Sequence, residues 1–428
     1  MERLMQYVWK HRLWAPSSMH TVDGRHVRVI DPGLENTNSG PDFFNAKIMI
    51  DDRLWAGDVE IHVRASDWHR HNHDGDPAYD SVILHVVDRD DDVILRSNGE
   101  AIPQMRMPCT PDFHRHYSAL VDRADIDLPC ASTIPDTPSI YIVDWLSTLA
   151  YERLYDKSER ISSLLSRLGG DWESVCYVTV ARALGFGING DPFERLALSL
   201  PLNFIGKHSD SLFSIEALLF GQSGLLDDAV SRGDSYAVAL AREYAFMAHK
   251  FGLSKPQSLG WKMSRMRPAN FPHRRIATLA AMLHGGFRMM SRFLDIKNID
   301  DAEIILSPSL TGYWEHRYSF GAESPQVATR LSRSSIVGIV INAVVPLMYA
   351  YADSHARTEL ADHAVELLQT LPPERNSIIE LFSRAGIKVT DAFTSQALIQ
   401  LRKAYCQNRK CLYCRIGHRL LSSRSRRP

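Results

Sequence analysis

The hydrophobic pattern of this chain changes its period once, near Ser139, and this change constrains the fold more than any other feature. Before it, apolar and polar residues alternate in short runs, as in half-buried strands. The clearest runs are HVRVI (26–30), FNAKIMI (44–50) and WAGDVEIHV (55–63). After it, apolar residues recur every three or four positions, as on the buried face of a helix. The sequence therefore predicts an α+β protein with a mixed α/β domain at 1–130, an all-helical domain at 139–404 and a Cys-rich basic tail at 405–428.

The first domain is expected to begin with an amphipathic helix at 2–14 and to contain a strand-rich core. The run SVILHVV (81–87) is almost entirely apolar and β-branched, which is typical of a central strand buried on both faces. A hairpin is expected where 44–50 and 55–63 flank the polar turn residues Asp51 and Asp52. A further strand is expected at 93–96, and three prolines mark 125–138 as a linker.

The second domain should consist of successive helices separated by Gly and Pro. Helical blocks are expected at 141–168, 172–185, 212–230, 233–251, 274–294, 325–332, 336–352, 355–371, 374–385 and 391–404. The block IVGIVINAVVPLMYAYA (336–352) has no charge and is almost long enough to span a bilayer. Asn342 and Pro346 interrupt it and no second such run exists, so a buried core helix is expected and no membrane. The opening residues lack a signal-peptide pattern, which predicts a cytoplasmic protein.

Net charge does not indicate a partner, because 49 Lys and Arg residues face 50 Asp and Glu residues. A nucleic-acid partner must therefore rest on local basic patches. One patch, in SRMRPANFPHRRI, is predicted to contact a phosphate backbone ahead of a helix; the alternative is a solvated loop capped by proline. The other follows the last cysteines, and its alternative is a frayed, soluble end. The candidate residues are Arg265, Arg267, Arg274, Arg275, Arg409, Lys410, Arg415 and Arg419.

The most distinctive chemistry lies between Gly40 and Val87. On a strand, residues two apart project from one face, so Asp58, Glu60 and His62 are expected to point the same way. Buried charges in such a row require compensation, which a divalent cation supplies, and Asp42 could complete the site. In the alternative interpretation, Asp58, Glu60 and His62 form the solvated face of an edge hairpin and bind no metal. The loop histidines are then exposed, and His85 is a hydrogen-bonded core histidine.

This arrangement resembles the pattern of PD-(D/E)xK nucleases: an acid at a strand start, a hairpin, then an acid-x-base pair. The resemblance implies a restriction-endonuclease-like core, with acids that hold magnesium or manganese and a base that acts on the attacking water. Here His62 replaces the usual lysine, so Lys47 on the neighbouring strand would have to take that role. Alternatively His62 is itself a ligand, joined by His69, His71, His73 or His85, and such a set suits zinc, manganese or iron.

A second metal site is predicted at the C-terminus. Cys406, Cys411 and Cys414 are spaced so that their thiolates can converge on one metal, and nearby arginines favour the thiolate form. Either His418 or Cys130 could be the fourth ligand. The first choice gives a zinc site; the second gives a four-cysteine site for zinc or an iron–sulfur cluster. One upstream cysteine with three near the C-terminus resembles the iron–sulfur staple of certain nucleases.

Several blocks resemble a bacterial family known as domain of unknown function number 2851. They are YVWKHRLW, SGPDFFNAKI, WAGDVEIHVRASDWHRH, DPAYDSVILHVV, RPANFPHRRIA, INAVVPLMYAYA and YCQNRKCLYCRIG. The resemblance implies a shared architecture and no activity. The residues themselves favour a metal-dependent nucleic-acid-processing protein in which Asp42 and Glu60 bind the cation and His62 is a ligand or general base. The alternative is a non-catalytic helical scaffold or binding protein with a structural metal.

Overall fold

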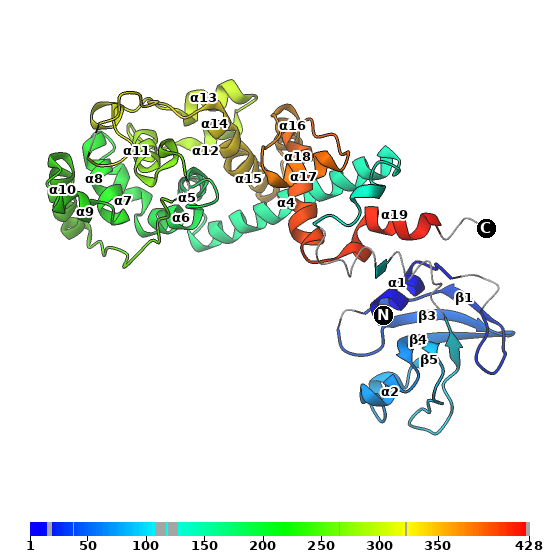
Figure 1. Ribbon diagram of the computed structural model, residues 1–428. Coiled ribbons are helices and arrows are strands. Elements are labelled where there is room, and N and C mark those ends of the chain that lie inside the picture. The colour runs from blue at the N-terminus through cyan, green and yellow to red at the C-terminus, as the bar shows by residue number, and fades with distance from the viewer. Residues whose placement is uncertain are drawn as a thin grey trace. The chain divides into compact units, whose positions relative to one another are not determined.

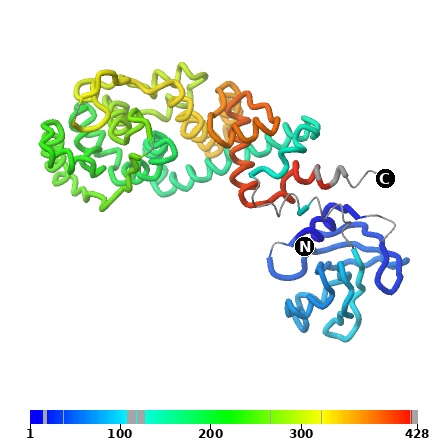
Figure 2. Tube along the Cα trace, viewed as in Figure 1, coloured from blue at the N-terminus to red at the C-terminus, as the bar shows by residue number. Residues whose placement is uncertain are grey.

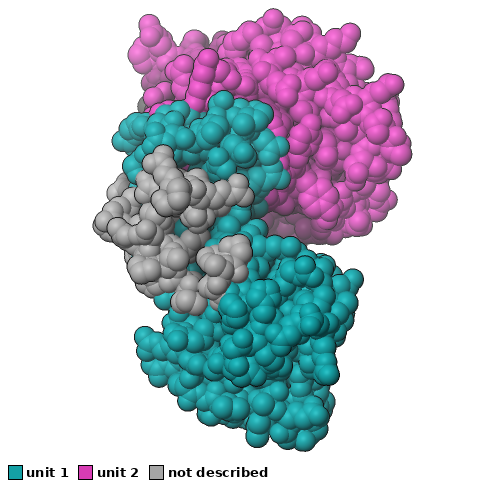
Figure 3. All heavy atoms as spheres, turned by 90° about the vertical axis from the view of Figure 1, so that its right-hand side faces the viewer, with its two compact units in different colours: residues 1–145, 384–387, 402–428 teal, residues 146–383, 388–401 magenta. Residues whose placement is uncertain are grey.

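The computed structural model describes residues 1–14, 19–36, 38–107, 117–118, 127–264, 266–321 and 323–424. The chain forms two compact units (Figure 3). The first comprises 1–145, 384–387 and 402–428, and the second comprises 146–383 and 388–401. The predicted α+β class is confirmed, because the first unit carries a six-stranded sheet and the second is helical (Figure 1).

The sheet contains both parallel and antiparallel strands, in the order β1-β3-β4-β5-β6. The short strand β2 also pairs with β3. The β1-β3 and β3-β4 pairs are antiparallel, whereas β4, β5 and β6 are parallel. The strands are β1 (Val27–Asp31), β2 (Leu34–Glu35), β3 (Phe43–Ile50), β4 (Arg53–Arg64), β5 (Val82–Arg89) and β6 (Gln104–Arg106). The predicted hairpin and the central strand β5 are confirmed. The strand expected at 93–96 is wrong: Leu95 makes only an isolated bridge, and the last strand is β6.

The two faces of the sheet are covered differently, and this difference creates the site. Helix α1 (Glu2–Lys10) packs its apolar side chains on one face, against Val59 and Ile61 of β4. The opposite face carries the short helix α2 (Asp67–Arg70), whose Trp68 is buried. Because side chains alternate along a strand, Glu60 and His62 project to the α2 side, where both are buried.

The second unit is built from helices around one large apolar core. Most of α4 (Ser139–Arg167) belongs to it. The others are α5 (Trp172–Leu184), α6 (Gly190–Ser199), α7 (Leu202–Gly206), α8 (Leu212–Ser223), α9 (Leu226–Ser231), α10 (Ser235–Phe251), α11 (Pro272–Leu283), α12 (Met289–Leu294), α13 (Ile299–Leu306), α14 (Arg333–Ile339), α15 (Val345–Ser354), α16 (Thr358–Thr370), most of α17 (Ser377–Arg384) and α18 (Ala392–Gln400). The helix expected at 325–332 is wrong, since these residues form bends and irregular backbone.

The long apolar run lies within a continuous helix from Arg333 to Ser354. Helices α14 and α15 are joined by a π-turn at Val340–Val344, which ends two residues before Pro346. A wider turn fits here because proline has no N–H to donate to the preceding turn. By length and composition this helix could cross a membrane, but 67% of its most apolar window is buried inside the protein.

The C-terminal segment returns to the first unit, as the trace in Figure 2 shows. A π-turn at Leu401–Cys406 leads into a short turn at Cys411–Tyr413 and then α19 (Arg415–Arg424). Leu421 of α19 is buried in the same core as the apolar side chains of α1, and Cys130 and Leu412 pack against that core. The tail is therefore part of the structure that supports the sheet.

Candidate metal centre

Asp42 and Glu60 lie next to each other, joined by a hydrogen bond. The backbone N–H of Asp42, just before β3, donates to Oε2 of Glu60 at 2.9 Å. Oδ2 of Asp42 accepts from the backbone N–H of Ile61 at 3.0 Å, and Oδ1 accepts from Nε2 of Gln6 at 2.8 Å. The structure thus brings together the two acids that the sequence singled out. Gln6 was not expected there; its signal is a lone polar residue among the buried positions of α1.

Both carboxyl groups are held in an environment that disfavours their charge. Burial raises the pKa of Glu60 to about 8 and that of Asp42 to about 7. For Asp42 the neighbouring Glu60 carboxylate contributes further, while hydrogen bonds from Gln6 and Ile61 oppose the shift. Two buried acids in contact repel each other when ionised. A bound cation would remove this repulsion and allow both to ionise.

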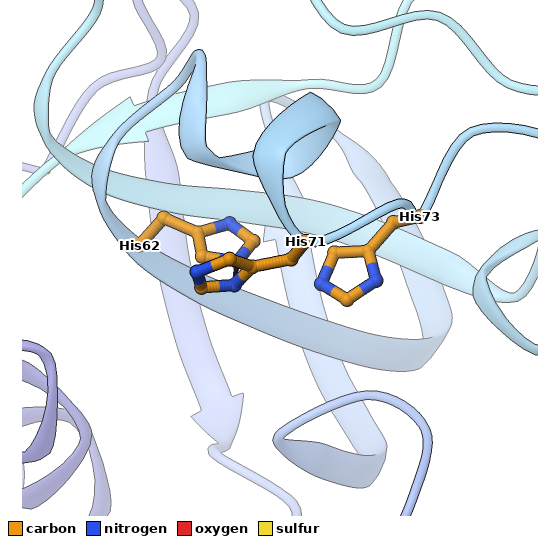
Figure 4. Close-up of side chains that lie close together, drawn as sticks. All are labelled: His62, His71 and His73. Carbon is orange, nitrogen blue, oxygen red and sulfur yellow. Dashed lines mark hydrogen bonds between the residues drawn. The ribbon is translucent and has the colours of Figure 1, made fainter.

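Three histidines, His62, His71 and His73, converge in the first unit (Figure 4). His62 comes from β4, His71 from the end of α2, and His73 from the loop that follows. One nitrogen from each lies within 4.8 Å of the others. Nε2 of His62 lies 3.1 Å from Nδ1 of His71 and 3.5 Å from Oε1 of Glu60, which is 3.3 Å from Nε2 of His73. Ligands bound to one ion at about 2.0–2.2 Å lie about 3–3.5 Å apart when adjacent, so this spacing suits a transition-metal ion.

The burial and protonation state of His62 and His73 also favour metal binding. Burial and the neighbouring His85, His71 and His73 lower the pKa of His62 to about 2. Burial also lowers the pKa of His73. Both imidazoles are therefore neutral near pH 7, which is the form that binds metals. Within the described residues, the buried Nε2 of His73 makes no hydrogen bond, because its 3.3 Å contact with Oε1 of Glu60 lacks hydrogen-bond geometry. A ligand for this atom would explain its position.

Other candidates from the same stretch lie outside this cluster. Lys47 is exposed and pairs with Ala56, four residues before Glu60 on β4, which places the two backbones about 13 Å apart. Asp58 accepts hydrogen bonds from the backbone of Asn45 and from the Ser81 hydroxyl, so it fixes the irregular pairing on either side of β4. His69 is exposed and paired with Asp74 and Asp92.

Four cysteines meet in the first unit at a second place. Cys130, Cys406, Cys411 and Cys414 line one cavity of about 20 Å³. A cavity of this volume holds one water-sized particle. The other candidate ligand, His418, is engaged elsewhere, since its Nδ1 lies 2.5 Å from the hydroxyl of Tyr7. Cys109 and Arg265 lie outside the described residues.

The basic residues divide into buried and exposed ones. Arg274 and Arg275 are each only 4% exposed, and this corrects the expectation that they contact nucleic acid. Arg274 donates to the backbone carbonyls of Trp314, Arg317 and Ala328, and Arg275 donates to Asn270. These guanidinium groups therefore have a structural role, because they hydrogen-bond to other parts of the protein interior. Of the remaining candidates, Arg267, Lys410 and Arg415 are exposed, and Arg409 and Arg419 are half-buried.

The C-terminal arginines contact other side chains of the first unit. Arg415 forms an ion pair with Asp144 and lies over the ring of Trp145. Arg419 lies over the ring of Tyr141, 4.7 Å from its centroid. Both pairs place α19 against the start of α4.

Comparison with known proteins identifies the family but no activity. The model of the family described as "Protein of unknown function (DUF2851)" matches residues 2–377, so the chain belongs to this family. No curated protein and no solved structure matches. The matched region contains Asp42, Glu60, the three histidines and Cys130, and it ends before Cys406.

Proposed function

We propose that this member of the DUF2851 family hydrolyses phosphodiester bonds of nucleic acid with a divalent metal ion held by Glu60, His62, His71 and His73. One observation carries the proposal. Asp42, at the start of β3, is hydrogen-bonded to Glu60 on the adjacent strand, two residues before His62. This is the order and placement of the acid and the acid-x-base pair in PD-(D/E)xK nucleases, with histidine at the basic position.

The ion would supply the chemistry that the side chains lack. A bound divalent metal polarises a phosphoryl oxygen and lowers the pKa of a bound water, which generates the nucleophile near neutral pH. A set of imidazoles with one carboxylate favours manganese, zinc or iron over magnesium. Of the two ions that the nuclease resemblance implies, magnesium and manganese, this ligand set favours manganese.

The side chains would divide the work by their contacts. Nδ1 of His62 faces His85, and Nε2 lies beside His71 and Glu60, so His62 would bind the ion through Nε2 and would not serve as a general base. Asp42 contacts Glu60 and would be ionised once the cation is bound, so its carboxylate would orient the attacking water and accept its proton. Lys47 has no part in this arrangement.

Purified full-length protein tests the proposal with single- and double-stranded DNA and RNA and with Mn²⁺, Zn²⁺, Fe²⁺ or Mg²⁺ added. Cleavage is expected with a transition ion and should stop with chelator. Glu60→Gln keeps an acceptor for the Asp42 N–H but loses the carboxylate. We expect it to lower the rate by more than the roughly 10- to 100-fold that loss of an outer-shell partner costs.

The matched control is Asp74→Asn, an exposed acid in the neighbouring loop, which should cleave like the wild type. Circular dichroism and the melting temperature establish that both variants are folded. Wild-type protein that cleaves none of these substrates with any ion would overturn the proposal. Full activity of Glu60→Gln would favour the non-catalytic scaffold as the alternative.

A further inference from the structure

We propose that Cys130, Cys406, Cys411 and Cys414 bind one thiophilic metal centre, a zinc ion or an iron–sulfur cluster, and that this centre anchors α1. The four residues come from two segments, at 130 and 406–414, that are far apart in the sequence and meet in the first unit. The metal centre itself is independent of the hydrolytic function proposed above.

The surroundings of the cavity between the cysteines suit thiolate ligands. Its remaining wall is largely apolar, with Leu128, Pro129 and Tyr405. The backbone N–H groups of Ile416 and Gly417 donate to the sulfur of Cys414. Donors of this kind stabilise a thiolate and orient it as a ligand. Four cysteine thiols lining one small, largely apolar cavity supply the ligand set of a four-cysteine metal site.

The fourth ligand is Cys130 and not His418. Cys130 lines the same small cavity as Cys406, Cys411 and Cys414. His418 points away from the cavity, toward Tyr7 of α1, and its ring also packs on that of His11 at 4.6 Å. The structure thus decides between the two ligands that the sequence leaves open.

The same segment holds α1 against the sheet. Cys414 directly precedes α19, which carries His418 and Leu421. His418 bonds to Tyr7, and Leu421 is buried in the core with the apolar residues of α1. The residue before Tyr7 is Gln6, which donates to Asp42. A metal centre that fixes the start of α19 therefore also fixes the helix behind the candidate site.

Full-length protein produced with zinc and iron supplied, and purified without oxygen, tests the assignment by elemental analysis, acid-labile sulfide and visible absorption. We expect either about one zinc and no colour, or iron with sulfide and a visible charge-transfer band. Either result supports a metal centre at the four cysteines, and the visible absorption distinguishes zinc from an iron–sulfur cluster. Four of the six cysteines should react with a thiol reagent only after the metal is removed.

Three variants separate binding from anchoring. Cys130→Ser should lose nearly all of this metal and should show faster hydrogen exchange in α1. His418→Ala should keep the metal but still show faster exchange in α1. Cys176→Ala, in the core of the second unit, should change neither.

Two results would overturn the proposal. One is folded wild-type protein with neither zinc nor iron above trace, in which Cys130, Cys406, Cys411 and Cys414 react with the thiol reagent without any metal having been removed. The other is Cys130→Ser with the metal content of the wild type. If Cys130→Ser does not fold, the metal content and thiol protection of the wild type decide the question. An unchanged α1 in His418→Ala would refute the anchoring.

Discussion

Nδ1 of His62 lies 2.9 Å from Nε2 of His85, a histidine with no exposed surface in the middle of β5. The two residues lie on neighbouring parallel strands, where Glu60 pairs with His85 and His62 with Val87. A histidine that binds a metal through Nε2 carries its proton on Nδ1, and this proton needs an acceptor. His85 provides that acceptor, so it orients His62 without reaching the ion.

Replacing His85 with Leu should weaken metal binding while leaving β5 intact, because the strand is otherwise apolar. Loss of the acceptor is expected to lower the affinity for Mn²⁺ by about 10- to 100-fold. Equilibrium dialysis with Mn²⁺ measures this loss, since manganese prefers nitrogen and oxygen ligands to the thiolates of the second site. His85→Gln, which retains an acceptor, should recover part of the affinity. Equal affinity of His85→Leu and wild type would show that His85 is only a packing residue.

His71 and His69 are a matched pair in the segment after β4, since both are exposed but only His71 points into the cluster. His71→Ala removes a ligand and should weaken Mn²⁺ binding at least as much as His85→Leu does. His69→Ala breaks only the exposed contacts with Asp74 and Asp92 and should bind Mn²⁺ like the wild type. The same dialysis measures both. A loss of similar size in the two variants would argue against a site at His71.

Parts of this site follow from local pattern and parts do not. Strand alternation predicts that Glu60 and His62 share a face, and it predicts β5 as the central strand. It does not show that the Asp58 carboxylate is already bound by Asn45 and Ser81 on the two neighbouring strands. That contact depends on irregular pairing in β3 and β5, which no pattern within β4 reveals.

Long-range contacts set the other limits of sequence-based prediction. The local sequence pattern of two arginines after a proline is the same whether their side chains face solvent or the interior. Arg274 is buried because it binds carbonyls 40 and more residues away. The choice between Cys130 and His418 likewise depends on where Tyr7 lies in space. The sequence leaves both ligands open, whereas in the structure Cys130 lines the cysteine cavity and His418 contacts Tyr7.

Gly417 is required by the cysteine turn, and its replacement should release the metal. A Cβ at this position would overlap the carbonyl oxygen of Cys411, so Gly417→Ala must displace the turn that carries Cys411 and Cys414. We expect loss of most of the cysteine-bound metal, measured by elemental analysis. Gly206→Ala is the control, since a Cβ there meets no atom within 4 Å. Full metal content in Gly417→Ala would contradict the described turn.

Arg274→Met tests the structural role of the buried arginine. The substitution leaves three backbone carbonyls without a donor, and we expect it to lower the free energy of unfolding by about 3 kcal/mol or more. Arg267→Met, at an exposed position, should change it by no more than about 0.5 kcal/mol. Denaturant titration followed by circular dichroism measures both. A stable Arg274→Met variant with weaker nucleic-acid binding would restore the original interpretation.

Glu216, in the core of the second unit, should make the stability of that unit depend on pH. Its Oε2 accepts hydrogen bonds from the Tyr236 hydroxyl at 2.6 Å and from the Trp314 indole at 3.1 Å. Burial nevertheless raises its pKa from 4.5 to about 7. The folded state therefore holds the proton more tightly than the unfolded state does. Its stabilising contribution is complete below pH 4.5, falls as the pH rises through about 7, and then levels off.

The difference between the two pKa values corresponds to about 3 kcal/mol. Glu216→Gln removes the titration but keeps an acceptor for Tyr236 and Trp314. The difference in unfolding free energy between Glu216→Gln and wild type should therefore shift by about 3 kcal/mol in favour of the variant between pH 4.5 and 8. Asp42 and Glu60 also have raised pKa values and change the unfolding free energy with pH in the same direction. Because both residues are present in the variant and in the wild type, their contribution cancels in the difference between the two proteins. A difference that stays constant with pH would mean that Glu216 is ionised in the folded protein throughout this range.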